Sequence, residues 1–403
     1  MSIICCMAAS CSELWPEKDW KDKLTGYDKV FLHYALGFNN LTSYLENNID
    51  EMCGSEVPDR HSGNVFLVLS HATSRSYDYK TRTCPCLYRV YKENGKVVRD
   101  TLVRYPDFTI AASAGTMRSV LSYVKDEFPS RSYGMVFTSH GTGWIPEGYD
   151  YNPERGGNRF SRLSAFELPK DPLTKSAGMH VSYDSSGDQI LYGIEIDDFV
   201  QSIPMHMDYI IFDACLMGCA EVAYQFKDVC SRLVLSPTEI MARGMDYTNM
   251  LEHLFNPGGA DIERVAEDYY NKYSENSNAS VCVVDCSQMD RLAAVCKDIV
   301  ANHRNGLRTI DRSRTQHLFY DDKEWFYDLR DIALNIGATQ EELTRLDEAL
   351  ASCITYERHT DRFFQLKLER VCGLSMYLPI ASSIKLNTFY RRLAWNDATD
   401  LVI

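Results

Sequence analysis

The chain has 403 residues, of which 45% are hydrophobic and 24% are charged, a composition typical of a globular protein with a large core. Its formal net charge of -14 argues against a nucleic-acid-binding protein, which would carry a basic stripe, and suits a cationic peptide as partner. The sequence contains no apolar run of about 18 residues, so no transmembrane helix is predicted.

The N-terminal stretch MSIICCMAASCSE is small and apolar and then turns polar. Residues 8–11 resemble the end of a bacterial lipoprotein signal, with Cys11 as the lipidated residue, although the basic segment is missing and the apolar segment is short. A mis-assigned start codon would explain the short segment. We expect residues 1–20 to be a signal remnant or a disordered tail, and the protein to be secreted or a cell-envelope lipoprotein, in the periplasm or at the surface.

Predicted strands and helices alternate along most of the chain. Asn94-Gly95 lies between two alternating runs and is a strong hairpin signal. Apolar, β-branched runs predict buried strands, and apolar residues at helical spacing predict helices. The main strands are expected at 64–72, 132–138, 207–215, 231–235 and 280–285, and the main helices at 116–128, 193–203, 216–227, 260–276 and 289–304. This alternation predicts an α/β fold with a mainly parallel sheet.

Helices dominate after about residue 256. In addition to the helices above, residues 322–358 are predicted to be helical, and a last strand is expected at 372–380. We therefore expect a first domain at 21–256 and a helical C-terminal subdomain at 257–403 that completes the fold. A polar segment at about 146–180, rich in Gly, Pro and Arg, is predicted to be a long loop.

Reactive residues follow two of the predicted strands. One strand ends in Ser139-His140-Gly141 and the next ends in Asp213-Ala214-Cys215. Because functional residues gather at the carboxyl ends of strands in open α/β sheets, His140 and Cys215 are expected to project from adjacent strand ends. A helix beginning near Leu216 would favour a thiolate at Cys215, and His140 would transfer the proton. The amides of Gly141 and Cys215 are candidates for an oxyanion hole.

Structural explanations compete with these roles. A cysteine at a strand end is more often a core residue, and Cys219 is expected only to pack inside the helix. Asp213 can cap that helix. The cysteines of Cys84-Pro85-Cys86 lack a second ligand pair at a useful spacing, so no metal site is expected. The occurrence of both strand ends in one sheet favours catalysis.

The segments MVFTSHGTGW and IIFDACLMGCAEVAYQF resemble the two catalytic blocks of the clostripain family of bacterial cysteine peptidases, peptidase family C11. That family belongs with caspases, gingipains and legumains in one clan, clan CD, and the resemblance spans about residues 60–380. The caspase signature differs, because here an aspartate precedes Ala214 and His140 lies 75 residues before Cys215. The resemblance implies a caspase-like α/β/α sandwich.

It also implies an endopeptidase that cuts protein or peptide substrates after Arg, and less readily after Lys, with Cys215 as nucleophile and His140 as general acid and base. Asp213 matches the acid at the floor of the pocket for the basic side chain, and Asp246 is a candidate second acid. Family members are often self-processing zymogens cut between the two blocks. The loop at 146–180 would then be an activation loop, or a basic loop without processing, and its candidate cleavage sites are Arg155, Arg159 and Arg162.

This chemistry requires no cofactor. Some members of the family depend on calcium, but the sequence has no EF-hand loop that supports a calcium site. A monomer, cleaved into two chains, is the simplest expectation from the family. Three alternatives stay open: a catalytically silent, surface-anchored binding protein on a peptidase fold, an acyl- or amidotransferase that uses the same residues, and a helical interaction module at 257–403.

Overall fold

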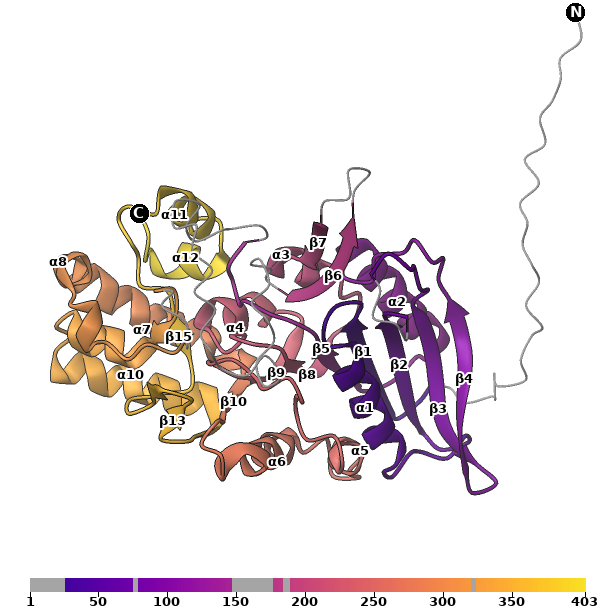
Figure 1. Cartoon of the computed structure of the whole chain (residues 1–403). Coiled ribbons are helices and arrows are strands. Elements are labelled where there is room, and N and C mark those ends of the chain that lie inside the picture. Colours follow the sequence, from indigo (N-terminus) through magenta and orange to yellow (C-terminus); the bar gives the residue numbers. More distant parts are fainter. Residues whose placement is uncertain (1–25, 75–78, 147–176, 184–188, 320–323) are drawn as a thin grey trace, which may run out of the picture.

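The structure is a computed structural model that describes residues 26–74, 79–146, 177–183, 189–319 and 324–403. These residues form one nine-stranded sheet in the order β12-β10-β9-β8-β5-β1-β2-β3-β4, with helices packed on its faces (Figure 1). Cys11 and the three arginines of the predicted activation loop lie outside the described residues.

Parallel strands make up the centre of the sheet, as the sequence predicted. Except for β9, which contains the exposed Ser231 and the half-buried Arg232, each is a nearly continuous run of buried apolar residues, the pattern expected when helices cover both faces. In sheet order these strands are β2 (Asn64–Ala72), β1 (Lys29–Gly37), β5 (Tyr133–Thr138), β8 (Met207–Asp213) and β9 (Cys230–Leu235). The centre of the sheet is therefore parallel.

Antiparallel strands extend the sheet at both edges. β3 (Cys86–Glu93) and β4 (Lys96–Arg104) form the predicted hairpin, in which Asn94 and Gly95 both have positive φ angles, 52° and 75°. At the other edge β10 (Ser280–Asp285) pairs with β9, and β12 (Ile354–His359) pairs with β10. Since β10 and β12 lie beyond residue 256, the proposed domain boundary cuts through one sheet, and the division stays a prediction.

The helices of the first half cover both faces of the sheet. The connection from β1 to β2 through α1 (Thr42–Cys53) runs in one direction across the sheet. The chain then returns in the opposite direction and adds β5, β8 and β9 in turn. Right-handed crossovers then place α1 on one face and the other helices on the opposite face. Those helices are α2 (Ala114–Glu127), α3 (Ile196–Gln201) and α4 (Ala220–Phe226).

The second half adds helices before, between and after β10 and β12 in the chain. Its helices are α5 (Met250–Leu254), α6 (Ile262–Ser274), α7 (Met289–Asn302), α8 (Arg304–Thr309), α9 (Leu329–Asn335), α10 (Gln340–Cys353), α11 (Ile384–Tyr390) and α12 (Ala394–Thr399). Three two-stranded sheets complete the described fold: β6 (Ala177–Tyr183) with β7 (Gln189–Ile194), β11 (Tyr327–Asp328) with β15 (Ser375–Met376), and β13 (Arg362–Phe363) with β14 (Leu366–Lys367).

Several predicted boundaries were wrong. Residues 189–194 form strand β7, so the helix expected at 193–203 begins only at Ile196. The segment 322–358 contains α9 and α10 but ends in the edge strand β12. The last strand expected at 372–380 is only β15, which pairs with β11 instead of joining the main sheet.

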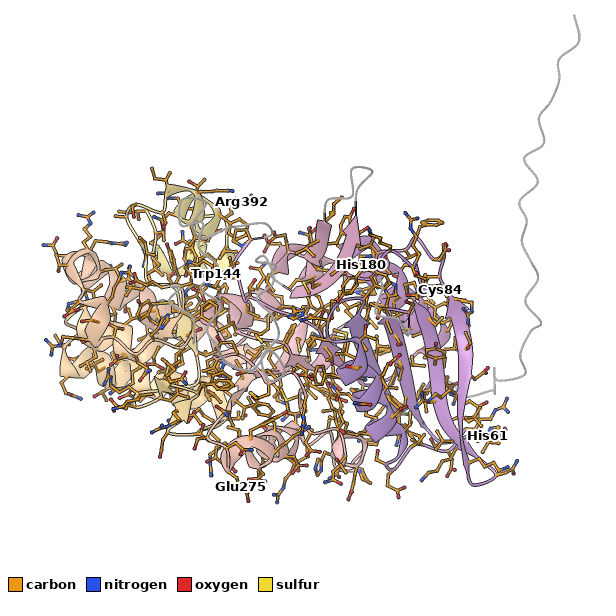
Figure 2. All side chains as sticks on the ribbon, viewed as in Figure 1. His61, Cys84, Trp144, His180, Glu275 and Arg392 are labelled. Carbon is orange, nitrogen blue, oxygen red and sulfur yellow. The ribbon has the colours of Figure 1, made fainter. Side chains whose placement is uncertain are left out.

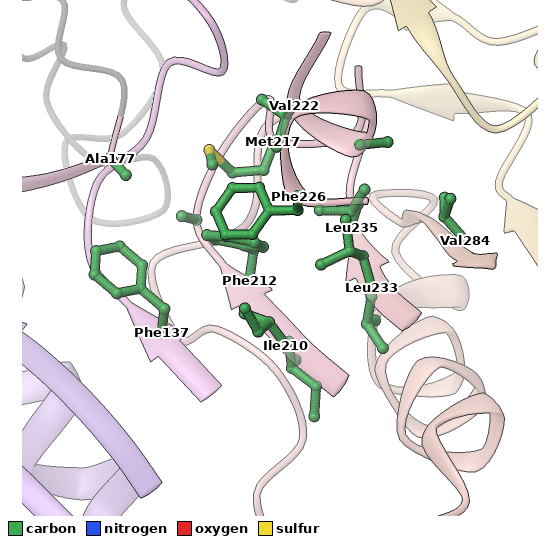
Figure 3. Packing of buried hydrophobic residues seen from close by; sticks show 14 of the residues in the cluster. Phe137, Ala177, Ile210, Phe212, Met217, Val222, Phe226, Leu233, Leu235 and Val284 are labelled. Carbon is green, nitrogen blue, oxygen red and sulfur yellow. The ribbon is translucent and has the colours of Figure 1, made fainter. Parts of the chain in front are cut away.

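A continuous apolar core links the central strands to the helices. Figure 3 shows Phe137 of β5, Phe212 of β8 and Phe226 of α4 packed between the sheet and the helix. The rings of Phe137 and Phe212 have centroids 5.9 Å apart, and those of Phe212 and Phe226 are 5.3 Å apart. This packing fixes the ends of β5 and β8, from which the candidate catalytic residues emerge.

Candidate active site

The pairing of β5 with β8 brings the two candidate blocks together. The strands are parallel, with Thr138 opposite Asp213, and the Ser139 amide donates to the Asp213 carbonyl oxygen over 3.3 Å. His140 and Cys215 each follow two residues beyond this opposed pair. Since neighbouring strands lie about 4.8 Å apart, the two residues leave the same edge of the sheet side by side.

Glycines permit the close contact of the two blocks. A Cβ atom at Gly141 would lie 2.9 Å from the Cys215 carbonyl oxygen, and one at Gly143 would lie 2.7 Å from that of Leu216. Gly143 also has a φ of +61°, which other residues rarely adopt. The backbone after β5 therefore rests directly on the backbone that carries Cys215.

His140 is buried and is oriented by an asparagine. Its Nε2 atom lies 2.7 Å from Oδ1 of Asn40, in the turn after β1. Because Oδ1 only accepts hydrogen bonds, this contact puts the ring proton on Nε2 and leaves Nδ1 to accept a proton. Burial lowers the pKa of His140 to about 3, so the imidazole is neutral at physiological pH.

Cys215 is also buried, and its thiol contacts the backbone of Ile240. The Sγ atom accepts from the Ile240 amide over 3.3 Å and lies 3.6 Å from its carbonyl oxygen. These contacts come from the segment that follows β9, the neighbour of β8 in the sheet. The nucleophile expected from the sequence is thus enclosed by backbone on one side.

The predicted helix next to Cys215 begins later than expected. Helix α4 starts at Ala220, with Cys219 as the flanking N-terminal residue, and Leu216 has a positive φ of 62°. The amides of Leu216 and Gly218 donate to the carbonyl oxygens of Thr238 and Ser236, so this segment is held by the chain that follows β9 and is not helical. Cys215 therefore does not lie at a helix N-terminus, and the dipole argument for its thiolate was wrong.

A small pocket opens beside Cys215. Its cavity volume is about 10 Å³, enough for about one water molecule. Both Cys215 and Asp213 line this pocket. Its lining residues are Leu41, Leu45, Thr138, Ser139, Asp213, Ala214, Cys215, Ile240, Met241, Ala242 and Gly244.

Asp213 supplies the carboxylate of this pocket. Its Oδ2 atom accepts hydrogen bonds from the Tyr247 hydroxyl and, over 3.2 Å, from the Met245 amide. Burial raises the pKa of Asp213 to about 6, although these two hydrogen bonds oppose the shift. The alternative that Asp213 caps the next helix was wrong, because α4 begins at Ala220 and the carboxylate is bound elsewhere.

A buried chain of hydrogen-bonded side chains supports Asp213 through Tyr247. The Tyr247 hydroxyl lies 2.9 Å from Oγ1 of Thr138, which lies 3.0 Å from Nε2 of His33. The ring of His33 stacks on that of Tyr247, with centroids 5.4 Å apart. A Cβ atom at Gly244, which also lines the pocket, would lie 2.1 Å from Oδ2 of Asp213, so only glycine leaves room for the carboxylate.

Other predicted site residues are less closely associated with the pocket. Asp246 is half-buried, and its Oδ1 atom accepts from the Thr248 amide over 2.9 Å. It is not among the described residues that line the pocket. Gly141 lies beside Cys215, but the oxyanion role of their amides stays a prediction. No cluster of three potential metal ligands occurs in the described part of the chain.

Sequence reasoning missed three residues of the site. Asn40 follows the strand β1, whose apolar run KVFLHYALG was itself a strand signal that the prediction did not use. Gly244 lies in a loop, and glycines in loops often have no special role. The sequence around Tyr247 contains no pattern that indicates a functional residue. Their contacts with His140 and Asp213 depend on pairing across the sheet.

Comparison with known proteins identifies this arrangement. The sequence matches the clostripain family, peptidase family C11, over residues 33–160 and 170–391. It is 24% identical over 252 residues to clostripain of Hathewaya histolytica, an alignment that covers 58% of this chain and 43% of that protein. The chain thus spans less than half the length of that relative. None of the helices in the described ranges is long and apolar enough to cross a membrane.

Solved structures agree in fold over almost the whole chain. An inactive zymogen C11 protease from Parabacteroides distasonis has a TM-score of 0.74 and 24% identity, covering 93% of this chain and 99% of that one. A secreted C11 cysteine protease from Bacteroides thetaiotaomicron has a TM-score of 0.73 and 26% identity, covering 93% and 100%. Since the family match includes both strand ends and the loop that completes the pocket, this chain belongs to the clostripain family of cysteine peptidases.

Proposed function

We propose that this chain is an endopeptidase that cuts after Arg, and less readily after Lys, with Cys215 as nucleophile and His140 as general acid and base. One observation carries the proposal: a single pocket is lined by both Cys215 and Asp213. A carboxylate at the floor of a narrow pocket binds a guanidinium by paired, charge-assisted hydrogen bonds. A scissile bond that follows the bound side chain would then lie at the thiol.

The residues support a stepwise acyl transfer. Nδ1 of His140 accepts the thiol proton, and the Cys215 sulfur attacks the scissile carbonyl carbon. The Gly141 and Cys215 amides stabilise the oxyanion, a role worth about 3 kcal/mol for each donor. His140 then returns the proton to the leaving amine, and in the second half it activates the water that hydrolyses the thioester. No step in this sequence requires a cofactor.

Two features of the structure support a precursor that is activated by cleavage. The cavity holds about one water molecule, which is too small for an arginine side chain. The chain that follows residue 176 is bound to the His140 block, because the Gly178 amide donates to the His140 carbonyl oxygen over 2.8 Å and the Met179 amide donates to Oγ of Ser139 over 3.1 Å. Cleavage before Gly178 would free this segment on one side and so allow the pocket to widen. The candidate cleavage sites are Arg155, Arg159 and Arg162.

A secreted or envelope location suits such a peptidase. The Bacteroides thetaiotaomicron relative is described as secreted, and lipidation at Cys11 would tether this chain to a membrane surface. Its substrates would be proteins or peptides that present Arg or Lys at the cleaved bond, and a cleaved monomer is the expected form. Asp246 remains a proposed second acid, which would have to turn away from Thr248 to reach the pocket.

Cleavage of matched peptides tests this function. Peptides that differ only in having Arg, Lys, Asp or Ala before the cut are incubated with the purified chain and with its Cys215→Ala variant, and each protein is followed on a denaturing gel. We expect the Arg peptide to be cut fastest and the wild-type chain to be nicked between His140 and Cys215, while the variant stays intact. Absence of cleavage by both proteins would favour a silent binding protein, and formation of amide products with added amines would favour a transferase.

A further inference from the structure

Two of the described cysteines outside the active site lie close to each other. The Sγ atoms of Cys84 and Cys86 are 3.8 Å apart. Cys86 is the buried first residue of β3, whereas Cys84, which precedes the strand, is partly exposed. Figure 2 labels Cys84 on the side of the molecule formed by β3 and β4. The proposed peptidase chemistry uses neither thiol.

The backbone around these two cysteines is held on both sides. The Tyr105 amide donates to the Pro85 carbonyl oxygen over 3.0 Å, and Nε2 of His71 donates to the Thr83 carbonyl oxygen over 3.1 Å. The proline ring further restricts the peptide between the thiols. The two sulfur atoms need to approach by only roughly 1.8 Å to reach disulfide bond length. The reduced state is thus already arranged for closure.

A cation completes this site. Nη1 of Arg104 lies 2.9 Å from Sγ of Cys84, and Arg104 is the residue of β4 that pairs with Cys86. A guanidinium beside a sulfur atom stabilises the negative charge of an attacking thiolate. Cys84 therefore combines partial exposure, a neighbouring cation and a second thiol within reach.

The other described cysteines do not share this combination. Cys230 and Cys286 also contact each other, but their exposed fractions are 0% and 1%, so an external oxidant does not reach them. Cys372 is partly exposed, and its Sγ atom lies 3.3 Å from the Leu374 carbonyl oxygen. These two environments serve as internal references for a pair that is buried and for a single thiol that is partly exposed.

We propose that Cys84 and Cys86 form a thiol–disulfide exchange site that closes by reaction with an external low-molecular-weight disulfide. The Cys84 thiolate attacks one sulfur of that disulfide, which forms a mixed disulfide and releases the first thiol. The Cys86 thiol then attacks Sγ of Cys84, which forms the Cys84–Cys86 bond and releases the second thiol. The external disulfide gains the two electrons and two protons that the cysteines lose.

Peptide mapping of the full chain tests this site. The folded protein is incubated in graded ratios of reduced to oxidised glutathione, quenched with acid, denatured and alkylated. Trypsin releases both cysteines in one peptide, Thr83–Arg89, because it cuts after Arg82 and after Arg89. We expect this peptide to lose two hydrogens and to escape alkylation, while peptides with Cys230, Cys286 and Cys372 stay fully alkylated.

Two variants distinguish the roles of the thiols. Cys86→Ser should accumulate the glutathione mixed disulfide at Cys84, and Cys84→Ser should leave Cys86 unmodified because it is buried. Full alkylation of the wild-type peptide at every glutathione ratio would overturn the proposal. Oxidation that occurs only together with the buried cysteines would also overturn it, since it would report unfolding. Neither result depends on whether the chain cleaves peptides.

Discussion

The most informative perturbation of the proposed specificity pocket is Tyr247→Phe. The Tyr247 ring is fully buried against His33, so phenylalanine preserves the packing and removes only the hydroxyl that donates to Asp213. A hydrogen bond to a charged group contributes about 1.5–3 kcal/mol, and one pKa unit corresponds to about 1.4 kcal/mol. The loss should therefore raise the pKa of Asp213 from about 6 by about one to two units.

This shift changes the pH dependence of cleavage in one direction. Only ionised Asp213 binds guanidinium. At pH 6 the fraction of the protein in which Asp213 is ionised should therefore fall from about one half in the wild type to between about one tenth and one hundredth in the variant. The assay is kcat/KM for the Arg peptide between pH 5 and 9, beside the peptide with Ala. The acid limb should move to higher pH for the Arg peptide alone.

Tyr269→Phe is the matched control for this experiment. Tyr269 is equally buried on α6, and its hydroxyl has no hydrogen-bond partner among the described residues. Its pH profile should coincide with that of the wild type. An unchanged acid limb in Tyr247→Phe, or an equal shift in both variants, would refute the assignment of Asp213 as the acid that binds the substrate.

Four further perturbations test the account. Asp213→Asn should abolish cleavage after Arg. Because the folded-state pKa of Asp213 is raised from 3.8 to about 6, the wild type loses stability as the pH rises through this range, and above pH 6 the variant should be more stable by up to roughly 3 kcal/mol. Urea unfolding at several pH values measures this difference in the free energy of unfolding. Gly244→Ala should lower kcat/KM for the Arg peptide at least about tenfold, because the added Cβ atom clashes with Asp213. Gly95→Ala is its control, since Gly95 has a similar φ but open space around it; it should lower the free energy of unfolding by only the backbone strain of about 1–2 kcal/mol and leave kcat/KM unchanged. Asn40→Ala should lower kcat by roughly tenfold to hundredfold with little change in KM, and an unchanged kcat in steady-state kinetics would exclude an orienting role. A chain that ends at residue 256 should fail to fold, as judged by circular dichroism, because it lacks β10 and β12; a native-like spectrum would instead identify 257–403 as a separate module.

Local signals predicted much of the fold. The β3–β4 hairpin could be located because Asn94 and Gly95 supply the positive φ angles that a two-residue turn needs. The strand ends at His140 and Cys215 could be placed in one sheet because parallel strands share an edge for their carboxyl ends. These are consequences of residue type and order alone.

Long-range pairing explains what the sequence did not reveal. The helix after Cys215 was expected at Leu216, but the amide of Leu216 bonds to Thr238, and no local pattern indicates that partner. The hydrogen bonds of Asn40 to His140 and of Tyr247 to Asp213 likewise join segments far apart in the chain. Such contacts depend on sheet order, which the sequence pattern did not specify.

The most direct measurement of the central claim is covalent labelling with an arginine-bearing, thiol-reactive ketone, mapped by mass spectrometry on the full chain after it has been allowed to process. We expect one labelled cysteine, Cys215, with labelling lost in His140→Ala and suppressed by excess Arg peptide but not by excess Asp peptide. Labelling of another cysteine, or equal suppression by both peptides, would contradict the assignment of Cys215 as the nucleophile of a site selective for Arg.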